Sequence, residues 1–88
     1  MRLDQFLKAS RLIRQRSMAK RACDAGHVEV LGRKAKAGTE VRVGDELTLN
    51  LRDRYLIVRV LEVPSGNVSR ERARTLYEIL EERHVSAF

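Results

Sequence analysis

Three arginines crowd a short stretch near the start of the chain, at positions 11, 14 and 16. A guanidinium group is planar and always charged, and its fork of N–H donors suits phosphate oxygens and the faces of flat rings. Arg11, Arg14 and Arg16 have no acidic residue within four positions on either side. Clustered cations without acids repel one another, so this stretch is more typical of a surface that meets an anion than of an ordinary solvated helix face.

The position of these arginines relative to a helix strengthens the case for an anion. A helix is expected over 17–25, with Ser17 as its N-cap and Gly26 directly after its end. Arg14 and Arg16 then stand at the amino end, where cations are unfavourable by about 0.3–1 kcal/mol each. A phosphate would reverse the sign, because the free helix N–H groups and the arginines would face the same anion.

The formal net charge of +6 is confined to one part of the chain. Residues 1–36 carry ten Lys or Arg against three acids, a balance of +7, whereas residues 37–88 carry eight against nine, a balance of −1. This asymmetry indicates a polyanionic partner, with nucleic acid favoured over an anionic membrane surface because the chain has no Trp. The candidate binding residues are Arg2, Lys8, Arg11, Arg14, Arg16, Lys20, Arg21, Arg33, Lys34 and Lys36.

The last three candidates follow a turn at Leu31-Gly32. A basic hairpin tip by itself is typical of plain solvent surface. If the strand before the turn runs back beside the second helix, however, this tip and the residues at 10–16 flank one concave patch. We therefore expect Arg33, Lys34 and Lys36 to form the rim of the main basic surface.

Other kinds of chemistry have little support in the residue types. Cys23 is the single cysteine, which excludes a disulfide framework, and its place beside alanines on a helix predicts an inert thiol. The carboxylates and the two histidines, His27 and His84, lack the spacing of a zinc site or a catalytic pair. We expect no catalysis, no metal and no cofactor. The apolar runs are too short for a membrane span or a signal peptide, which predicts a cytoplasmic protein with no membrane partner.

Hydrophobic spacing and turn residues predict the elements that position these side chains. Helices are expected at 3–9 and 17–25, and an amphipathic helix at 69–83 is expected to close the chain. Short strands are expected at 27–30, 47–51 and 55–63. The fold class is therefore α+β, in which two short N-terminal helices pack on a small curled antiparallel sheet and a C-terminal helix closes the fold.

Two short helices joined by a connector are also compatible with a DNA-binding helix-turn-helix. In that arrangement the second helix would read base edges from the major groove. We expect Met18, Ala22 and Ala25 of this helix to be buried instead, and the helix has no Asn or Gln to recognise adenine. The DNA-reading hypothesis is the weaker one.

Four short motifs follow one another along the first half of the chain. They are Arg2-Leu3-Asp4-x-x-Leu7, Ser17-x-Ala19, Gly26-His27-Val28-Glu29-Val30-x-Gly32 and Val43-Gly44-Asp45-Glu46-Leu47. In this order they resemble the RNA-binding domain first recognised in small-subunit ribosomal protein four, with Leu31 where that family commonly has Asn. The resemblance implies an RNA-binding domain over 1–50, with 51–88 forming a hairpin extension and a C-terminal helix packed on the same single domain.

The length of the chain and its Arg2-Leu3-Asp4 start are similar to the stand-alone RqcP (YabO) group, which is related to heat-shock protein fifteen. This resemblance implies a monomeric, non-enzymatic factor that binds 23S rRNA and peptidyl-tRNA on the large ribosomal subunit carrying a stalled nascent chain. It also implies support of C-terminal alanine tailing by an RqcH-type tailing factor. Two alternatives stay open: a heat-shock-like rescue factor without a tailing role, and an adaptor whose helix at 69–83 docks a protein.

Overall fold

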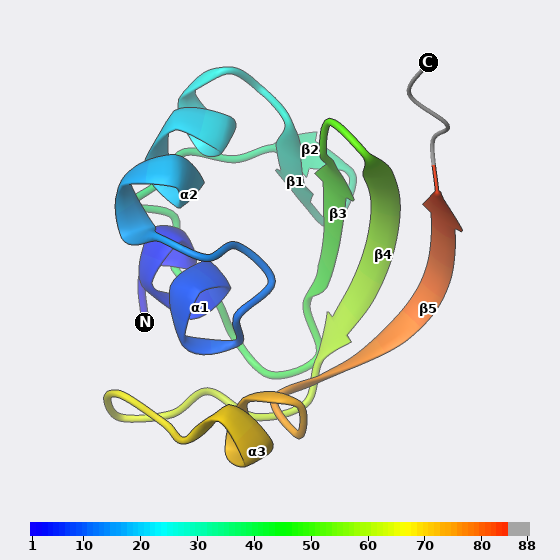
Figure 1. Ribbon diagram of the computed structural model, residues 1–88. Helices are drawn as coiled ribbons and strands as arrows, with labels where there is room; N and C mark the ends of the chain where they lie inside the picture. The colour runs from blue at the N-terminus through cyan, green and yellow to red at the C-terminus, as the bar shows by residue number, and fades with distance from the viewer. Residues whose placement is uncertain (85–88) are drawn as a thin grey trace.

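One antiparallel sheet and three helices make up residues 1–84, the part of the chain that this computed structural model describes. The elements are α1 (Leu3–Ala9), α2 (Arg16–Asp24), β1 (Val28–Val30), β2 (Arg33–Lys34), β3 (Glu46–Asn50), β4 (Arg54–Val60), α3 (Arg70–Ala73) and β5 (Tyr77–His84). The strands lie in the order β2-β1-β3-β4-β5. The helices α1 and α2 lie together on one side of the curved sheet (Figure 1). The expected α+β class, with two N-terminal helices on a small antiparallel sheet, is confirmed.

The core lies between this helix pair and the sheet. From α1, Leu3, Phe6 and Leu7 are completely buried. Burial alternates along β3 and β4, because successive side chains of a strand point to opposite faces. The strand residues that face the helices are Leu47, Leu49, Leu56, Val58 and Val60. Burying each such side chain contributes about 1.5–3 kcal/mol to the stability of the fold, and this holds α1 and α2 against the sheet.

The second helix begins two residues earlier than expected, with Gln15 instead of Ser17 as its N-cap, and it buries a different face. Its first residue is Arg16, and Gly26 follows its end with a left-handed φ of 80°, as expected. Ala19 and Cys23 are the buried residues of α2, whereas Met18 is 44% exposed. The burial predicted for Met18 and Ala25 was therefore wrong, whereas Ala22 is partly buried against the core. The helix buries the neighbouring i, i+4 pair instead, and it packs against α1.

The closing helix expected at 69–83 is also wrong. Only the short α3 is helical there, and β5 follows it and pairs antiparallel with β4. Without β5, the apolar strand β4 would carry an open edge of unpaired backbone groups. Glu78 lies opposite Arg59 and accepts its hydrogen bond at 2.9 Å, and Arg83 lies 5.0 Å from the centre of the Tyr55 ring. Strand pairing thus overrides the helical spacing of this segment.

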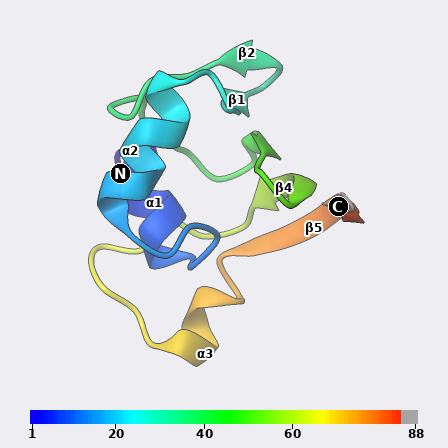
Figure 2. The ribbon, with the colours of Figure 1, turned by 45° about the horizontal axis from the view of Figure 1, so that its top comes forward.

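The helix pair and β5 occupy opposite parts of the molecule. Figure 2 shows α1 and α2 against each other, with α3 set apart from both and β5 running along the far edge of the sheet. Within residues 1–84, no helix is long and apolar enough to cross a membrane.

Candidate nucleic-acid interface

A nearly buried carboxylate brings two of the candidate arginines to one point. Asp4, whose side chain is 3% exposed, accepts a hydrogen bond from Nε of Arg2 at 3.2 Å and another from Nε of Arg16 at 3.3 Å. Burial raises the pKa of Asp4, but the hydrogen bonds and charges of the two arginines outweigh it, so the pKa lies below its ordinary value of 3.8. The carboxylate stays ionised and orients both side chains, which remain about half exposed, at 50% and 49%.

Asp4 also changes the electrostatics at the start of α2. Arg16 is the first residue of the helix, Gln15 is its cap, and the first turn contains no acid. The carboxylate of Asp4, which comes from α1, offsets part of the unfavourable interaction between Arg16 and the positive helix end. Sequence reasoning missed this ion pair because the two residues are twelve positions apart. In the described residues, no side chain accepts a hydrogen bond from the N–H groups that open α2.

The connector between α1 and α2 forms a basic hollow with a loop from the second half of the chain. Lys8, Arg11 and Arg14 line a cavity of about 190 Å³ together with Asn67. An adjoining cavity of about 140 Å³ is lined by Lys8, Arg16 and Asn67, among others. Across residues 1–84, no carboxylate lies within 4 Å of Lys8, Arg11 or Arg14. Four candidate cations therefore line two adjoining cavities, and the sequence analysis did not predict that the loop around Asn67 completes both.

Arg11 has an unusual backbone in this hollow. It follows Ser10, the C-cap of α1, and its φ of 62° lies in the left-handed region. Its N–H donates to the carbonyl of Lys8 at 3.0 Å, which closes the end of the helix. Glycine is the usual residue at this position, because a side chain costs about 1–2 kcal/mol there. Arg11 thus places a long cationic side chain at a position where glycine would avoid backbone strain.

The rim cations lie at the other end of α2. The amine of Lys34 lies beside Gly26, and Lys34 and Lys36 line a cavity of about 400 Å³ with Cys23 and Asp24. A cation is favourable there, because this is the carboxyl end of the helix. The nine-residue helix spans about 14 Å, so the connector and the hairpin tip do not flank one concave patch as expected.

The remaining candidates are exposed single side chains. Lys20 and Arg21 lie along α2 between the two groups, and Arg33 lies on β2. The turn before Arg33 is the expected one, with Leu31 and Gly32 both in the left-handed region at φ values of 52° and 80°. Asn tolerates this conformation better than Leu does.

The basic half of the chain matches a known family. Residues 1–47, which include all ten candidate cations, match the S4 domain. The chain belongs to the S4 domain family. Two similar relatives are each named RQC P-site tRNA stabilizing factor. That of Halalkalibacterium halodurans is 45% identical over 98% of this chain and 97% of the relative, and that of Bacillus subtilis is 43% identical over 93% and 94%.

Solved structures support the same assignment. A trimeric structure of heat shock protein 15 from Vibrio cholerae superposes on this S4-domain protein with a TM-score of 0.81 and 28% identity, covering 90% of this chain and 80% of that one. The solution structure of a hypothetical protein, HP1423, has a TM-score of 0.73 and 30% identity and covers both chains completely. The resemblance to the RqcP group and its relation to heat-shock protein fifteen are thereby confirmed.

The single thiol of this S4-domain protein lies in the core. Cys23 is buried, and burial, with the negative charges of Asp4 and Asp24, raises its pKa to about 11. The group stays a protonated thiol at neutral pH, and the expected inert core role agrees with this environment. Within residues 1–84, no group of three His, Cys, Asp or Glu side chains is placed to hold a metal ion.

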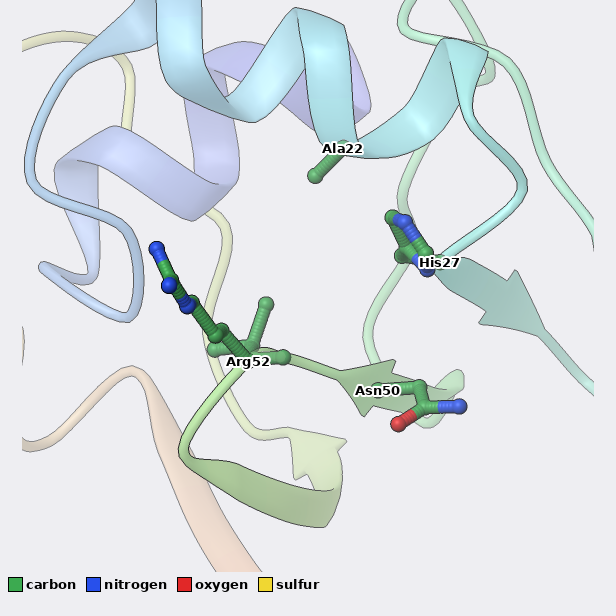
Figure 3. A pocket seen from close by; sticks show the side chains of 5 residues that line it. Ala22, His27, Asn50 and Arg52 are labelled. Atoms are coloured by element: carbon green, nitrogen blue, oxygen red, sulfur yellow. The ribbon is translucent and has the colours of Figure 1, made fainter. Parts of the chain in front are cut away.

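This S4-domain protein also has a groove between α2 and the β3–β4 hairpin that sequence reasoning missed. Ala22, His27, Asn50 and Arg52 line a hollow of about 500 Å³ (Figure 3). An adjoining hollow of about 380 Å³ shares Ala22 and Arg52 with it and reaches Arg14. The two hollows form one groove, called here the hairpin groove. No spacing signal in the sequence connects residues 14–27 with residues 50–54.

Proposed function

We propose that this protein is a non-enzymatic RNA-binding factor of ribosome quality control, which acts on the large ribosomal subunit that carries a stalled nascent chain. The observation that carries the proposal is the Asp4-held pair, Arg2 and Arg16, next to the cations of the connector hollow. The relatives named RQC P-site tRNA stabilizing factor support a role in this process and contact with tRNA.

The main surface would hold RNA through its phosphates. Its cations are Arg2, Lys8, Arg11, Arg14, Arg16, Lys20 and Arg21, with Arg33, Lys34 and Lys36 as a rim. Because the ionised Asp4 fixes two guanidinium groups in advance, less side-chain freedom is lost when a phosphate binds. A backbone that runs along α2 would meet Arg16 at one end and Lys34 at the other. Such contacts recognise the shape of an A-form stem or loop with little reading of bases.

The detailed role that we propose is the one implied by the resemblance to the RqcP group. The RNA partners would be 23S rRNA and peptidyl-tRNA, and binding would support C-terminal alanine tailing by an RqcH-type factor. We propose a monomer, although the solved relative heat shock protein 15 is trimeric. The similarity to that relative favours one alternative, a rescue factor without a tailing role. A tailing assay in cells that lack the protein distinguishes the two, because only the leading hypothesis expects the loss of alanine tails.

Arg16→Ala tests the surface directly. Association with large subunits in a sucrose gradient is expected to weaken at least about tenfold, since one charged hydrogen bond contributes about 1.5–3 kcal/mol. Thermal unfolding should change little, because Arg16 is half exposed and Asp4 keeps Arg2 as a partner.

The matched control is Arg72→Ala. Arg72 is 51% exposed and also pairs with one carboxylate, that of Glu62, but it lies on α3, away from the helix pair. This variant should bind as the wild type does. Binding of Arg16→Ala at wild-type strength would show that the assignment of the surface is wrong.

A further inference from the structure

The hairpin groove has an apolar floor that solvent can reach. Met18 from α2 and Leu51 from the hairpin line the part that reaches Arg14, above the nearly buried Leu12 and Ile13 of the connector. Within residues 1–84, Met18 is one of the few large apolar side chains that are strongly exposed, at 44%. An exposed apolar surface of this kind suits the face of an aromatic ring better than it suits a phosphate.

Cations surround this floor. Arg14, Arg52 and Arg54 line the groove against one acid, Asp53. Arg54 is already engaged, because its Nη2 donates to the carbonyl of Leu12 at 3.2 Å and ties the hairpin to the connector. Arg52 forms no ion pair within residues 1–84, and Figure 3 shows its side chain reaching along the groove below Ala22. A free guanidinium beside an apolar floor can stack on a base or bind its phosphate.

The groove is continuous with the basic hollow of the connector. Arg14 lines both, so a strand whose phosphates lie over Lys8, Arg11 and Arg14 has its next nucleotide at the mouth of the groove. The far end is bounded by His27, whose ring is a hydrogen-bonding group at the edge of the hollow. Excess positive charge and this continuity favour a nucleotide over a segment of protein.

We propose that the hairpin groove binds one unstacked nucleobase of the bound RNA, with Met18 and Leu51 against its face and Arg52 stacked on it or paired with its phosphate. This inference rests on the proposed function and adds to it a place where the RNA must be unpaired. The protein would then prefer a stem with an extruded nucleotide over a perfect stem.

Three synthetic hairpins of equal stem length test this inference by fluorescence anisotropy: one fully paired, one with a single-nucleotide bulge and one with an abasic residue in that bulge. The wild type is expected to bind the bulged RNA roughly tenfold more tightly than the other two, the effect of stacking one base. Arg52→Ala should remove this preference, and Arg52→Lys, which keeps the charge without the planar group, should remove most of it. Arg74→Ala, an arginine loss at the exposed C-cap of α3, should preserve it.

Failure of this inference can be told apart from failure of the proposed function. Arg16→Ala should weaken the binding of all three RNAs by the same factor. If it weakens the binding of none of them, the assignment of the proposed surface is wrong. Equal binding of the bulged and abasic RNAs by the wild type would overturn the nucleobase site while leaving that surface intact. If the wild type shows no preference and Arg52→Ala still loses recruitment to large subunits, the groove binds a protein and the inference is wrong.

Discussion

Arg11 combines a long cationic side chain with a backbone conformation that glycine adopts more easily. Its φ of 62° ends α1, and its side chain lines the connector hollow without a carboxylate partner in residues 1–84. Strained residues persist where the surrounding structure holds them, and they cluster at functional sites. The strained backbone of Arg11 thus places its cationic side chain in the positive surface of the connector hollow.

Arg11→Gly should separate stability from binding. The free energy of unfolding is expected to rise by about 0.5–1 kcal/mol, because glycine relieves the left-handed strain but adds freedom to the unfolded chain. RNA affinity should fall severalfold with the lost charge. Arg11→Ala is the control: it loses the same charge without relieving the strain. Urea unfolding and anisotropy measure the two effects, and a glycine variant that binds as the wild type does would contradict a role for Arg11 in binding.

At the scale of elements, a network of ion pairs around the buried carboxylate of Asp4 ties α1 to α2. Asp4 accepts hydrogen bonds from Arg2, Arg16 and the N–H of Gln5. Because the pKa of Asp4 is lower in the folded protein than its ordinary value of 3.8, its contribution to stability is complete above that value. The contribution is lost as the pH falls through the lower, folded pKa.

Asp4→Asn should therefore destabilise the protein in a pH-dependent way. At pH 7 the loss is expected to be about 1–2 kcal/mol, and the difference from the wild type should shrink below pH 3.8. Glu40→Gln is a suitable control, since Glu40 and its partner Arg42 are both exposed and their pair contributes little. Urea unfolding at pH 7 and pH 3 measures the difference. A loss that stays constant between these pH values would show that the charge of Asp4 is not the stabilising feature.

The same scale shows what the sequence could predict. The helix at 3–9 and the strands at 27–30 and 47–51 follow from local apolar spacing and turn residues, and they agree with α1, β1 and β3 of the structure. The segment 69–83 carries apolar residues at helical spacing, yet its partner β4 is an apolar strand that needs a neighbour. Whether this segment forms a helix or a strand depends on contacts between residues far apart in sequence, and local apolar spacing carries no information about those contacts. The hairpin groove was missed for the same reason.

For the candidate site, residue type was more predictable than arrangement. The ten cations lie within the S4 domain and are exposed, because charged side chains seldom become fully buried. How these cations are grouped along α2 depends on the direction in which the chain continues from the end of the helix into β1. Asp4 is an acid in the first turn of α1, a common position, and only the packing of α1 on α2 makes it the residue that orients Arg2 and Arg16.

At the scale of the whole molecule, the charge asymmetry of the sequence becomes a separation in space. The ten cations of residues 1–36 lie on the helix pair, its connector and the β1–β2 hairpin, while Glu78, Glu81 and Glu82 lie on β5 at the far edge of the sheet. Exposed charges more than about 8 Å apart are largely screened at physiological salt. The local arrangement of cations, more than the net charge of +6, should thus set the affinity for RNA.

The salt dependence of RNA binding tests this distinction. A plot of log K against log salt concentration is expected to have a slope of about −4 if the Asp4-held pair and Lys8, Arg11 and Arg14 are the five cations that contact phosphates, since each contact contributes about −0.7 to −0.9. Arg14→Ala lowers the net charge by one and should reduce the slope by nearly one contact. Glu81→Lys raises the net charge by two on β5 and should leave the slope unchanged, because its charge lies away from the bound phosphates. Slopes that follow net charge wherever the substitution lies would show that RNA is held by a diffuse positive field, and the defined surface around Asp4 would then have no special role.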